Sequence, residues 1–137
     1  MTDTYTGGCA CGAIRYAIDA APIAMNDCQC RQCQHESGTG HASHLTFPRA
    51  AVRLDGKATL WEMTGDGGTV KSRAFCPVCG APVYMTFPAM PEFFVVRAAS
   101  LDDPGRYQPQ FVTWHAAGPA WDRVDPSLPA FEAMPPG

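Results

Sequence analysis

The chain has 137 residues, 46% of them hydrophobic and 17% charged, with a formal net charge of −3. This balance predicts one globular domain over residues 1–137 and excludes a disordered chain. Lysine and arginine are scattered singly, so nucleic acid is not an expected partner. The amino terminus has no basic stretch followed by an apolar run, and no uncharged segment is long enough to cross a bilayer. We therefore expect a cytoplasmic protein without membrane contact.

Thirteen prolines and thirteen glycines divide the chain into short segments, many of them rich in β-branched and aromatic residues. Strands are predicted over residues 13–18, 51–54, 59–63, 70–75, 83–87, 93–98 and 110–115. Asp66-Gly67-Gly68 predicts a hairpin turn between residues 59–63 and 70–75, because glycine accepts the positive φ of such turns. No window carries a helical stripe, and only single turns are predicted, at 34–37 and 129–133. The expected fold is mainly β, antiparallel, with little helix.

Seven cysteines fall into three groups: Cys9 and Cys11; Cys28, Cys30 and Cys33; Cys76 and Cys79. Their odd number and a reducing compartment argue against a disulfide framework. The first and last groups have the spacing of half-sites, so together they predict a closed tetrathiolate zinc site that joins distant parts of the chain. An iron–sulfur cluster is the rival, but its common cysteine spacings are absent.

The middle group places three thiols within six residues, so Cys28, Cys30 and Cys33 can surround one ion and leave its fourth position open. Three thiolates make a bound zinc a weak Lewis acid that suits a soft ligand, such as an incoming thiolate. Two zinc ions per chain are therefore expected. A fourth protein ligand would instead make both sites structural. The candidates for that ligand are His35, the first suspect, with His41, His44 and His115.

Other polar residues have competing interpretations. His41 and His44 are predicted to be surface or loop residues, and His115 a satisfied, half-buried strand histidine. Arg31 either offsets part of the trithiolate charge, binds a substrate carboxylate, or is a solvated loop residue. Glu36 is either a general acid or base beside the open site or an exposed carboxylate at a helix start.

The whole constellation resembles the glutathione-dependent formaldehyde-activating enzyme family, also called the GFA or CENP-V family. The motifs that carry the resemblance are Gly7-Gly8-Cys9-Ala10-Cys11-Gly12, Cys28-Gln29-Cys30-Arg31-Gln32-Cys33 and Phe75-Cys76-Pro77-Val78-Cys79-Gly80, followed by Leu101-Asp102-Asp103-Pro104 and Trp121-Asp122. The resemblance implies an Mss4-like fold with a structural zinc on Cys9, Cys11, Cys76 and Cys79, and a catalytic zinc on Cys28, Cys30 and Cys33. It also implies a carbon–sulfur lyase that interconverts S-hydroxymethylglutathione with formaldehyde and glutathione.

Three positions depart from the family pattern. The family often has arginine where this chain has Gln34, histidine at the position of Val112, and a basic residue at the position of Gly118. If those groups hold an anionic tripeptide, this chain is expected to bind another small thiol. The alternative from a different class is a non-catalytic zinc-binding adaptor module in which both zinc sites are structural.

Overall fold

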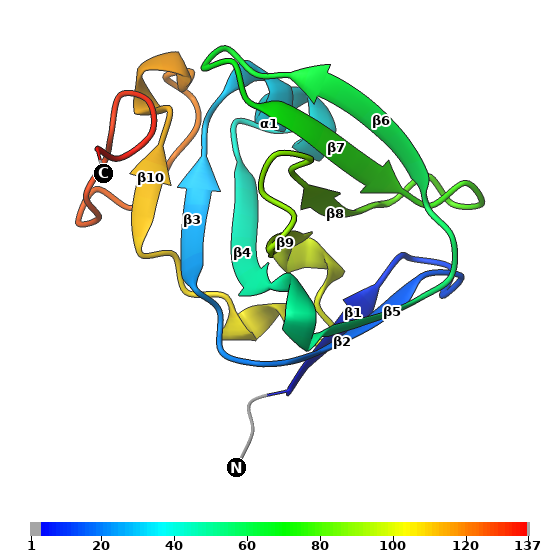
Figure 1. Ribbon diagram of the computed structural model, residues 1–137. Coiled ribbons are helices and arrows are strands. Elements are labelled where there is room, and N and C mark those ends of the chain that lie inside the picture. The colour runs from blue at the N-terminus through cyan, green and yellow to red at the C-terminus, as the bar shows by residue number, and fades with distance from the viewer. Residues whose placement is uncertain (1–3, 137) are drawn as a thin grey trace.

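The computed structural model describes residues 4–136, which form a three-stranded and a seven-stranded sheet (Figure 1). The small sheet has the order β1-β2-β5 and is antiparallel throughout. Its strands are β1 (Thr4–Gly8), β2 (Arg15–Asp19) and β5 (Val52–Asp55). The predicted domain over 1–137 includes residues 1–3 and 137, which lie outside the described range.

The large sheet has the order β10-β3-β4-β9-β8-β7-β6. Its strands are β3 (Ala24–Cys28), β4 (Ala42–Pro48), β6 (Thr59–Thr64), β7 (Val70–Phe75), β8 (Pro82–Thr86), β9 (Phe93–Arg97) and β10 (Phe111–Thr113). All neighbours in it are antiparallel except β10 and β3, which are parallel. The prediction of a mainly β, antiparallel fold is confirmed.

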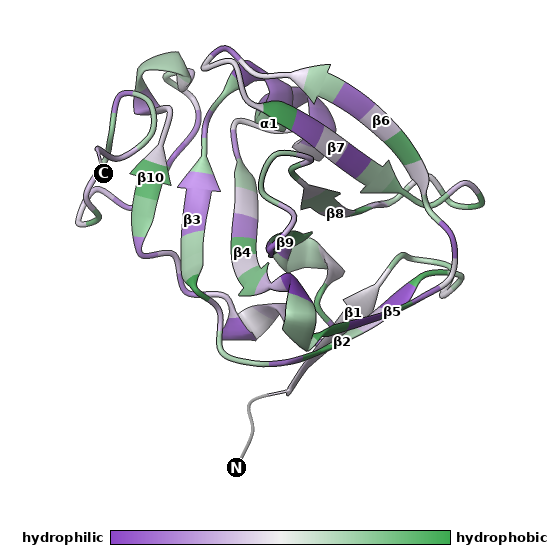
Figure 2. Ribbon diagram, in the orientation of Figure 1, coloured by the Kyte–Doolittle hydropathy of each residue, from purple (hydrophilic) through white to green (hydrophobic). Residues whose placement is uncertain are grey.

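Alternating side chains build the core between these strands. The burial pattern of β1 and β2 alternates residue by residue, as expected for a sheet with one covered face. Figure 2 shows hydrophobic and hydrophilic residues alternating along the second half of β4, whereas β7 has a run of hydrophilic residues between hydrophobic ends. The central cluster of side chains with no exposed surface consists of Ile14, Ile18, Leu45, Phe47, Val83, Phe94 and Val96, together with Cys76. Two cysteines of the predicted tetrathiolate site, Cys76 and the almost fully buried Cys9, therefore belong to the main core.

Helical structure is limited to α1 (Arg31–Ser37) and four 3-10 turns: Arg49–Ala51, Ala98–Ser100, Pro104–Arg106 and His115–Ala117, in the described residues. Helix α1 is longer than the turn predicted at 34–37. It begins after Cys30, whose Sγ accepts the Cys33 N–H, and ends at Gly38, whose φ of +75° favours glycine. Within residues 4–136, none of the helices is both long and apolar enough to traverse a membrane.

The predicted strands at 51–54, 59–63, 70–75, 83–87 and 93–98 each coincide with a strand, and the turn at Asp66-Gly67-Gly68 joins β6 to β7. Gly68 has the positive φ that the turn requires. The predictions missed β1, β3 and β4. Asn26 and Asp27 in β3 and Ser43 and His44 in β4 interrupt the apolar pattern, and these strands are specified by their neighbours in the sheet instead.

The helical turn predicted at 129–133 is wrong. This segment runs beside β10: Ala130 forms a parallel bridge with Val112, and the Phe131 N–H donates to the Val112 carbonyl. The strand predicted to 115 ends at Thr113, because Trp114 has a φ of +54° that is incompatible with an extended strand.

Candidate metal centres

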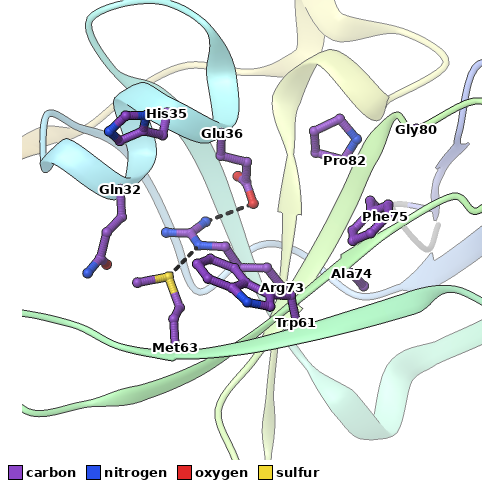
Figure 3. Close-up of a pocket in the computed structure, with 10 residues that line it drawn as sticks. All are labelled: Gln32, His35, Glu36, Trp61, Met63, Arg73, Ala74, Phe75, Gly80 and Pro82. Carbon is purple, nitrogen blue, oxygen red and sulfur yellow. Dashed lines mark hydrogen bonds and ion pairs between the residues drawn. The ribbon is translucent and has the colours of Figure 1, made fainter.

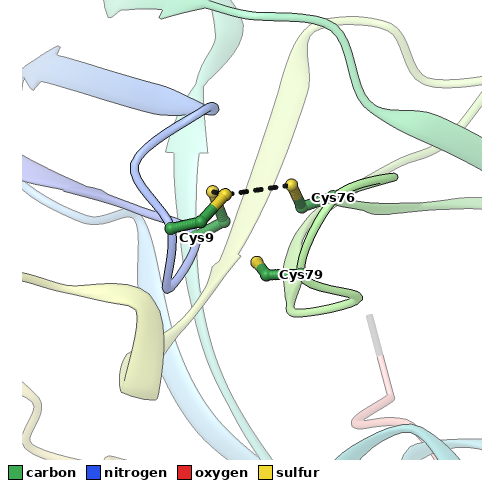
Figure 4. A group of neighbouring side chains, drawn as sticks. Cys9, Cys76 and Cys79 are labelled. Carbon is green, nitrogen blue, oxygen red and sulfur yellow. Dashed lines mark hydrogen bonds between the residues drawn. The ribbon is translucent and has the colours of Figure 1, made fainter.

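Four cysteines from distant parts of the chain meet at one point. Cys9 and Cys11 lie in the loop between β1 and β2, whereas Cys76 and Cys79 lie in the turn between β7 and β8 (Figure 4). Their Sγ atoms are all within 4.8 Å of one another, and the Cys9–Cys11 and Cys11–Cys76 distances are both 3.7 Å. Four sulfurs around one zinc are expected about 3.8 Å apart, so the donor set fits a tetrahedral ion.

Backbone donors around this four-cysteine site favour thiolates. The Ile14 N–H lies 3.2 Å from the Cys9 Sγ, and the Val78 N–H lies 3.4 Å from the Cys76 Sγ. The backbone N–H of Ala81 is the largest influence on the exposed Cys79, whose pKa is lowered to about 6. Because metal ligands must lose their protons, these bonds prepare the site for a cation.

The second group, Cys28, Cys30 and Cys33, comes from a short segment that joins β3 to α1. Cys28 ends the strand, Cys30 caps the helix and Cys33 lies in its first turn. All three are buried, and their Sγ atoms lie within 4.8 Å of one another. Among the described residues, no histidine, aspartate or glutamate joins this trio as a fourth group of the same closeness. Its chemistry fits a metal ion with a position left for another ligand.

The four histidines differ in exposure and in the residues that they contact. His35 is exposed, with its Nε2 3.4 Å from Arg31 Nη2, and is not close to the trio's sulfurs. His41 contacts Asp122, with 2.8 Å between Nδ1 and Oδ2. His115 begins a 3-10 turn and is exposed, so its prediction as a half-buried strand residue is wrong.

His44 was expected on the surface, but it is buried, and its Nε2 lies 3.9 Å from the Cys33 Sγ. The expectation failed because β4 was not predicted: within the sheet, His44 pairs with Arg97 of β9. Burial, and then the charges of Arg97 and Arg73, hold the pKa of His44 well below its usual range. The imidazole is therefore neutral at neutral pH.

A buried charge cluster lies against the trio. Arg73 Nη1 is 2.8 Å from Glu36 Oε2, and Arg97 bonds the same carboxylate through Nε. Arg73 Nη2 also lies 3.8 Å from the Cys33 Sγ, and its Nε donates to the Met63 sulfur (Figure 3). Within residues 4–136, the two Nη atoms of Arg97 have no hydrogen-bond partner and no contact with solvent.

This cluster corrects the expectation of an exposed Glu36 at a helix start, because the Glu36 side chain is only 12% exposed. Burial raises the pKa of Glu36, but the hydrogen bond to Arg97 and the charges of Arg97 and Arg73 outweigh it and leave the pKa lowered. Two cations and one anion leave a net positive charge beside the thiols. No sequence motif marks Arg73 or Arg97, because each lies singly in an ordinary strand.

Two cavities flank this region. One, of about 350 Å³, reaches Cys28 and Cys30 and is bordered by the β6–β7 hairpin, β8, β9 and Trp114. The other, of about 390 Å³, lies between α1 and strands β6 and β7, where Trp61, Met63 and Arg73 line it (Figure 3). The first cavity is the one that gives a ligand access to Cys28 and Cys30.

The three departures from the family pattern have structural roles. The buried Gln34 side chain donates from Nε2 to the carbonyls of Gln29 (2.9 Å) and Ala117 (3.1 Å). Val112 is fully buried in β10. A Cβ at Gly118 would lie 2.4 Å from Gln29 Nε2, so no side chain fits there as the structure stands. These residues join α1 and the trio segment to the turn that follows β10.

Comparison with known proteins agrees with this arrangement. A crystal structure of a Rhodobacter sphaeroides protein superposes with a TM-score of 0.57 over 92% of this chain and 99% of the other, at 20% sequence identity. This likeness supports the fold. The family model for the glutathione-dependent formaldehyde-activating enzyme matches residues 4–117, which include all seven cysteines. The chain therefore belongs to the glutathione-dependent formaldehyde-activating enzyme family.

Proposed function

We propose that this protein is a zinc-dependent carbon–sulfur lyase that acts on a small thiol–aldehyde adduct such as S-hydroxymethylglutathione. In this proposal Cys9, Cys11, Cys76 and Cys79 hold a structural zinc, whereas Cys28, Cys30 and Cys33 hold the zinc of the reaction. The observation that carries it is a three-cysteine group, without an equally close fourth ligand in residues 4–136, at the wall of a cavity. We also propose a cytoplasmic location, because free thiols persist in a reducing compartment.

The proposed reaction is a reversible cleavage. The carbon–sulfur bond of the hemithioacetal breaks, the hydroxyl oxygen becomes the aldehyde oxygen, and the hydroxyl proton and the sulfur leave together as the thiol. A zinc ion held by the trio would supply a position for the thiolate sulfur. The cavity would exclude water from the adduct and orient it against Cys28 and Cys30.

The charge cluster would tune this site. Three thiolates around a divalent zinc carry a net charge of about −1, which by itself would repel an incoming thiolate. Arg73 and Arg97, less the charge of Glu36, contribute one positive charge nearby. Arg73 also donates to the Cys33 sulfur. We propose that this positive charge reduces the repulsion and so allows a fourth thiolate to bind.

Exchange spectroscopy on formaldehyde and glutathione tests the activity. The zinc-loaded protein is expected to accelerate interconversion with S-hydroxymethylglutathione above the spontaneous rate. Cys28→Ser should bind one zinc instead of two, remain folded and return the rate to background. An unaccelerated exchange with the intact protein would remove glutathione as the thiol. Loss of folding in Cys28→Ser would show that the trio is structural.

The alternative is a non-catalytic zinc-binding adaptor module, and one observation favours it: buried His44 lies 3.9 Å from Cys33 and could move to close the second site. Cobalt substitution distinguishes the two functions. If His44 is a ligand, His44→Ala should change the visible spectrum of cobalt in the second site. Under the lyase proposal that spectrum should respond to added thiol and change little in His44→Ala.

A further inference from the structure

The cavity that reaches the trio is lined mainly by apolar side chains. These are Ile23, Met85, Phe87, Met90, Phe93, Val95, Trp114 and Met134. Three of the chain's six methionines are among them. Methionine is unbranched and polarisable, so it adapts to apolar groups of different shape. These walls are suited to an apolar ligand of variable outline.

Several of these apolar side chains are exposed to water. Ile23 is 55% exposed, Met90 36% and Met134 62%. A single exposed apolar residue is common on protein surfaces, but several that line one cavity indicate a binding surface. An apolar group in the cavity would remove them from water together.

Charged groups are few on the same walls. Lys71 is the one lysine or arginine among the lining residues in the described chain, and Asp66 the one acid. The Lys71 side chain has no hydrogen bond or ion pair with another described residue. Lys71 lines the same cavity as Cys28 and Cys30, so this cation lies near the trio.

We propose that the adduct bound here carries an extended apolar group, either an alkyl chain or an aromatic ring, and at most one negative charge, paired with Lys71. This inference rests on the proposed lyase function and specifies its substrate class. A tripeptide with two carboxylates and an ammonium would place charges against methionine and phenylalanine, at a desolvation cost that one lysine and one aspartate cannot offset fully. The apolar group can belong to the thiol or to the aldehyde.

Binding to the cobalt-loaded full-length protein tests the thiol as its source. A series of ω-mercaptoalkanoates of increasing length is titrated while the cobalt–thiolate absorption is recorded, with glutathione as the polar reference. The dissociation constant is expected to fall about fourfold for each added methylene until the cavity is full. In Lys71→Gln, the mercaptoalkanoates should bind more weakly, whereas uncharged mercaptoalcohols of equal length should not.

The aldehyde is tested in a second arm, with 3-mercaptopropionate kept as the thiol and formaldehyde compared with hexanal and benzaldehyde in the exchange assay. A gain with chain length in the first arm assigns the apolar group to the thiol, and a gain for hexanal or benzaldehyde in the second assigns it to the aldehyde. Either gain supports the proposal.

Variants at the exposed apolar residues test whether the gain in binding or rate arises in this cavity. Met90→Gln and Met134→Gln should flatten the dependence on chain length. Leu60→Gln is the matched control, since Leu60 is 59% exposed but does not line the cavity. Preference for glutathione with formaldehyde, or no gain in either arm, would overturn the inference and leave the lyase function intact. A cobalt spectrum that no thiol changes would overturn both.

Discussion

The two cysteine sites differ in how the chain builds them. The four-cysteine site joins two loops whose nearest cysteines, Cys11 and Cys76, are 65 residues apart in sequence, and its Cys11 and Cys79 are exposed. The trio comes from one short segment, is buried, and contacts the cluster of Arg73, Arg97 and Glu36. A metal site that joins distant loops cross-links the fold and so stabilises it. A site formed within one short segment adds no such cross-link, and the side chains packed around it determine its chemistry. The proposed division between structure and reaction follows from this difference.

Removing one cysteine from each site is expected to give the largest difference in protein stability between the two sites. Cys76→Ser should unfold the chain or destabilise it by more than about 4 kcal/mol. The four-cysteine site binds metal only when the chain is folded, so the free energy of metal binding stabilises the fold, and Cys76 also lies in the core. Cys28→Ser should cost much less. Circular dichroism during denaturation, with metal analysis of each variant, measures the difference. Equal destabilisation by the two substitutions would contradict the division.

Arg73→Met should weaken the trio's zinc affinity by about 10- to 100-fold, because it removes the donor to the Cys33 sulfur and one positive charge. The four-cysteine site should be unaffected. Chelator competition measures both affinities in one titration. Arg97→Met is the matched control, since Arg97 pairs with the same Glu36 but has no hydrogen bond to a trio sulfur in the described residues. An unchanged affinity in Arg73→Met would exclude this role.

Gly118→Ala should destabilise the protein by about 1–3 kcal/mol, through a clash with Gln29 in the trio segment. Gln29 cannot easily move, because it is buried and bonded to Asp122 and His115. Gly67→Ala is the control, because the nearest atom to its new Cβ is 4.0 Å away. Equal denaturation midpoints for the two variants would show that the trio segment is loosely held.

Asp102→Asn should have the smallest effect, less than about 1 kcal/mol, since its ion pair with Arg15 beside the Cys9 loop is about half exposed. Hydrogen bonds from Arg15 and Thr6 lower the pKa of Asp102 to about 2. The stabilisation is therefore complete above the unfolded value of about 3.9 and is lost as the pH falls through about 2. Denaturation of both proteins across this pH range should show that the difference in their free energies of unfolding disappears in acid. A difference that does not change with pH would show that the Asp102 charge is not its cause.

Cysteine spacing was sufficient to predict the two groupings of thiols, because CxC, CxxC and CxCxxC segments can turn their side chains toward one ion only in a few ways. The β class and the β6–β7 hairpin were also predictable, since β-branched runs and a Gly-Gly turn are local signals. The strands β3 and β4 were not, because Asp27 and His44 are buried only by their partners in the sheet. Tertiary structure alone decided what surrounds the trio: Glu36, Arg73 and Arg97 come from separate elements, and they meet because one carboxylate must compensate two buried cations.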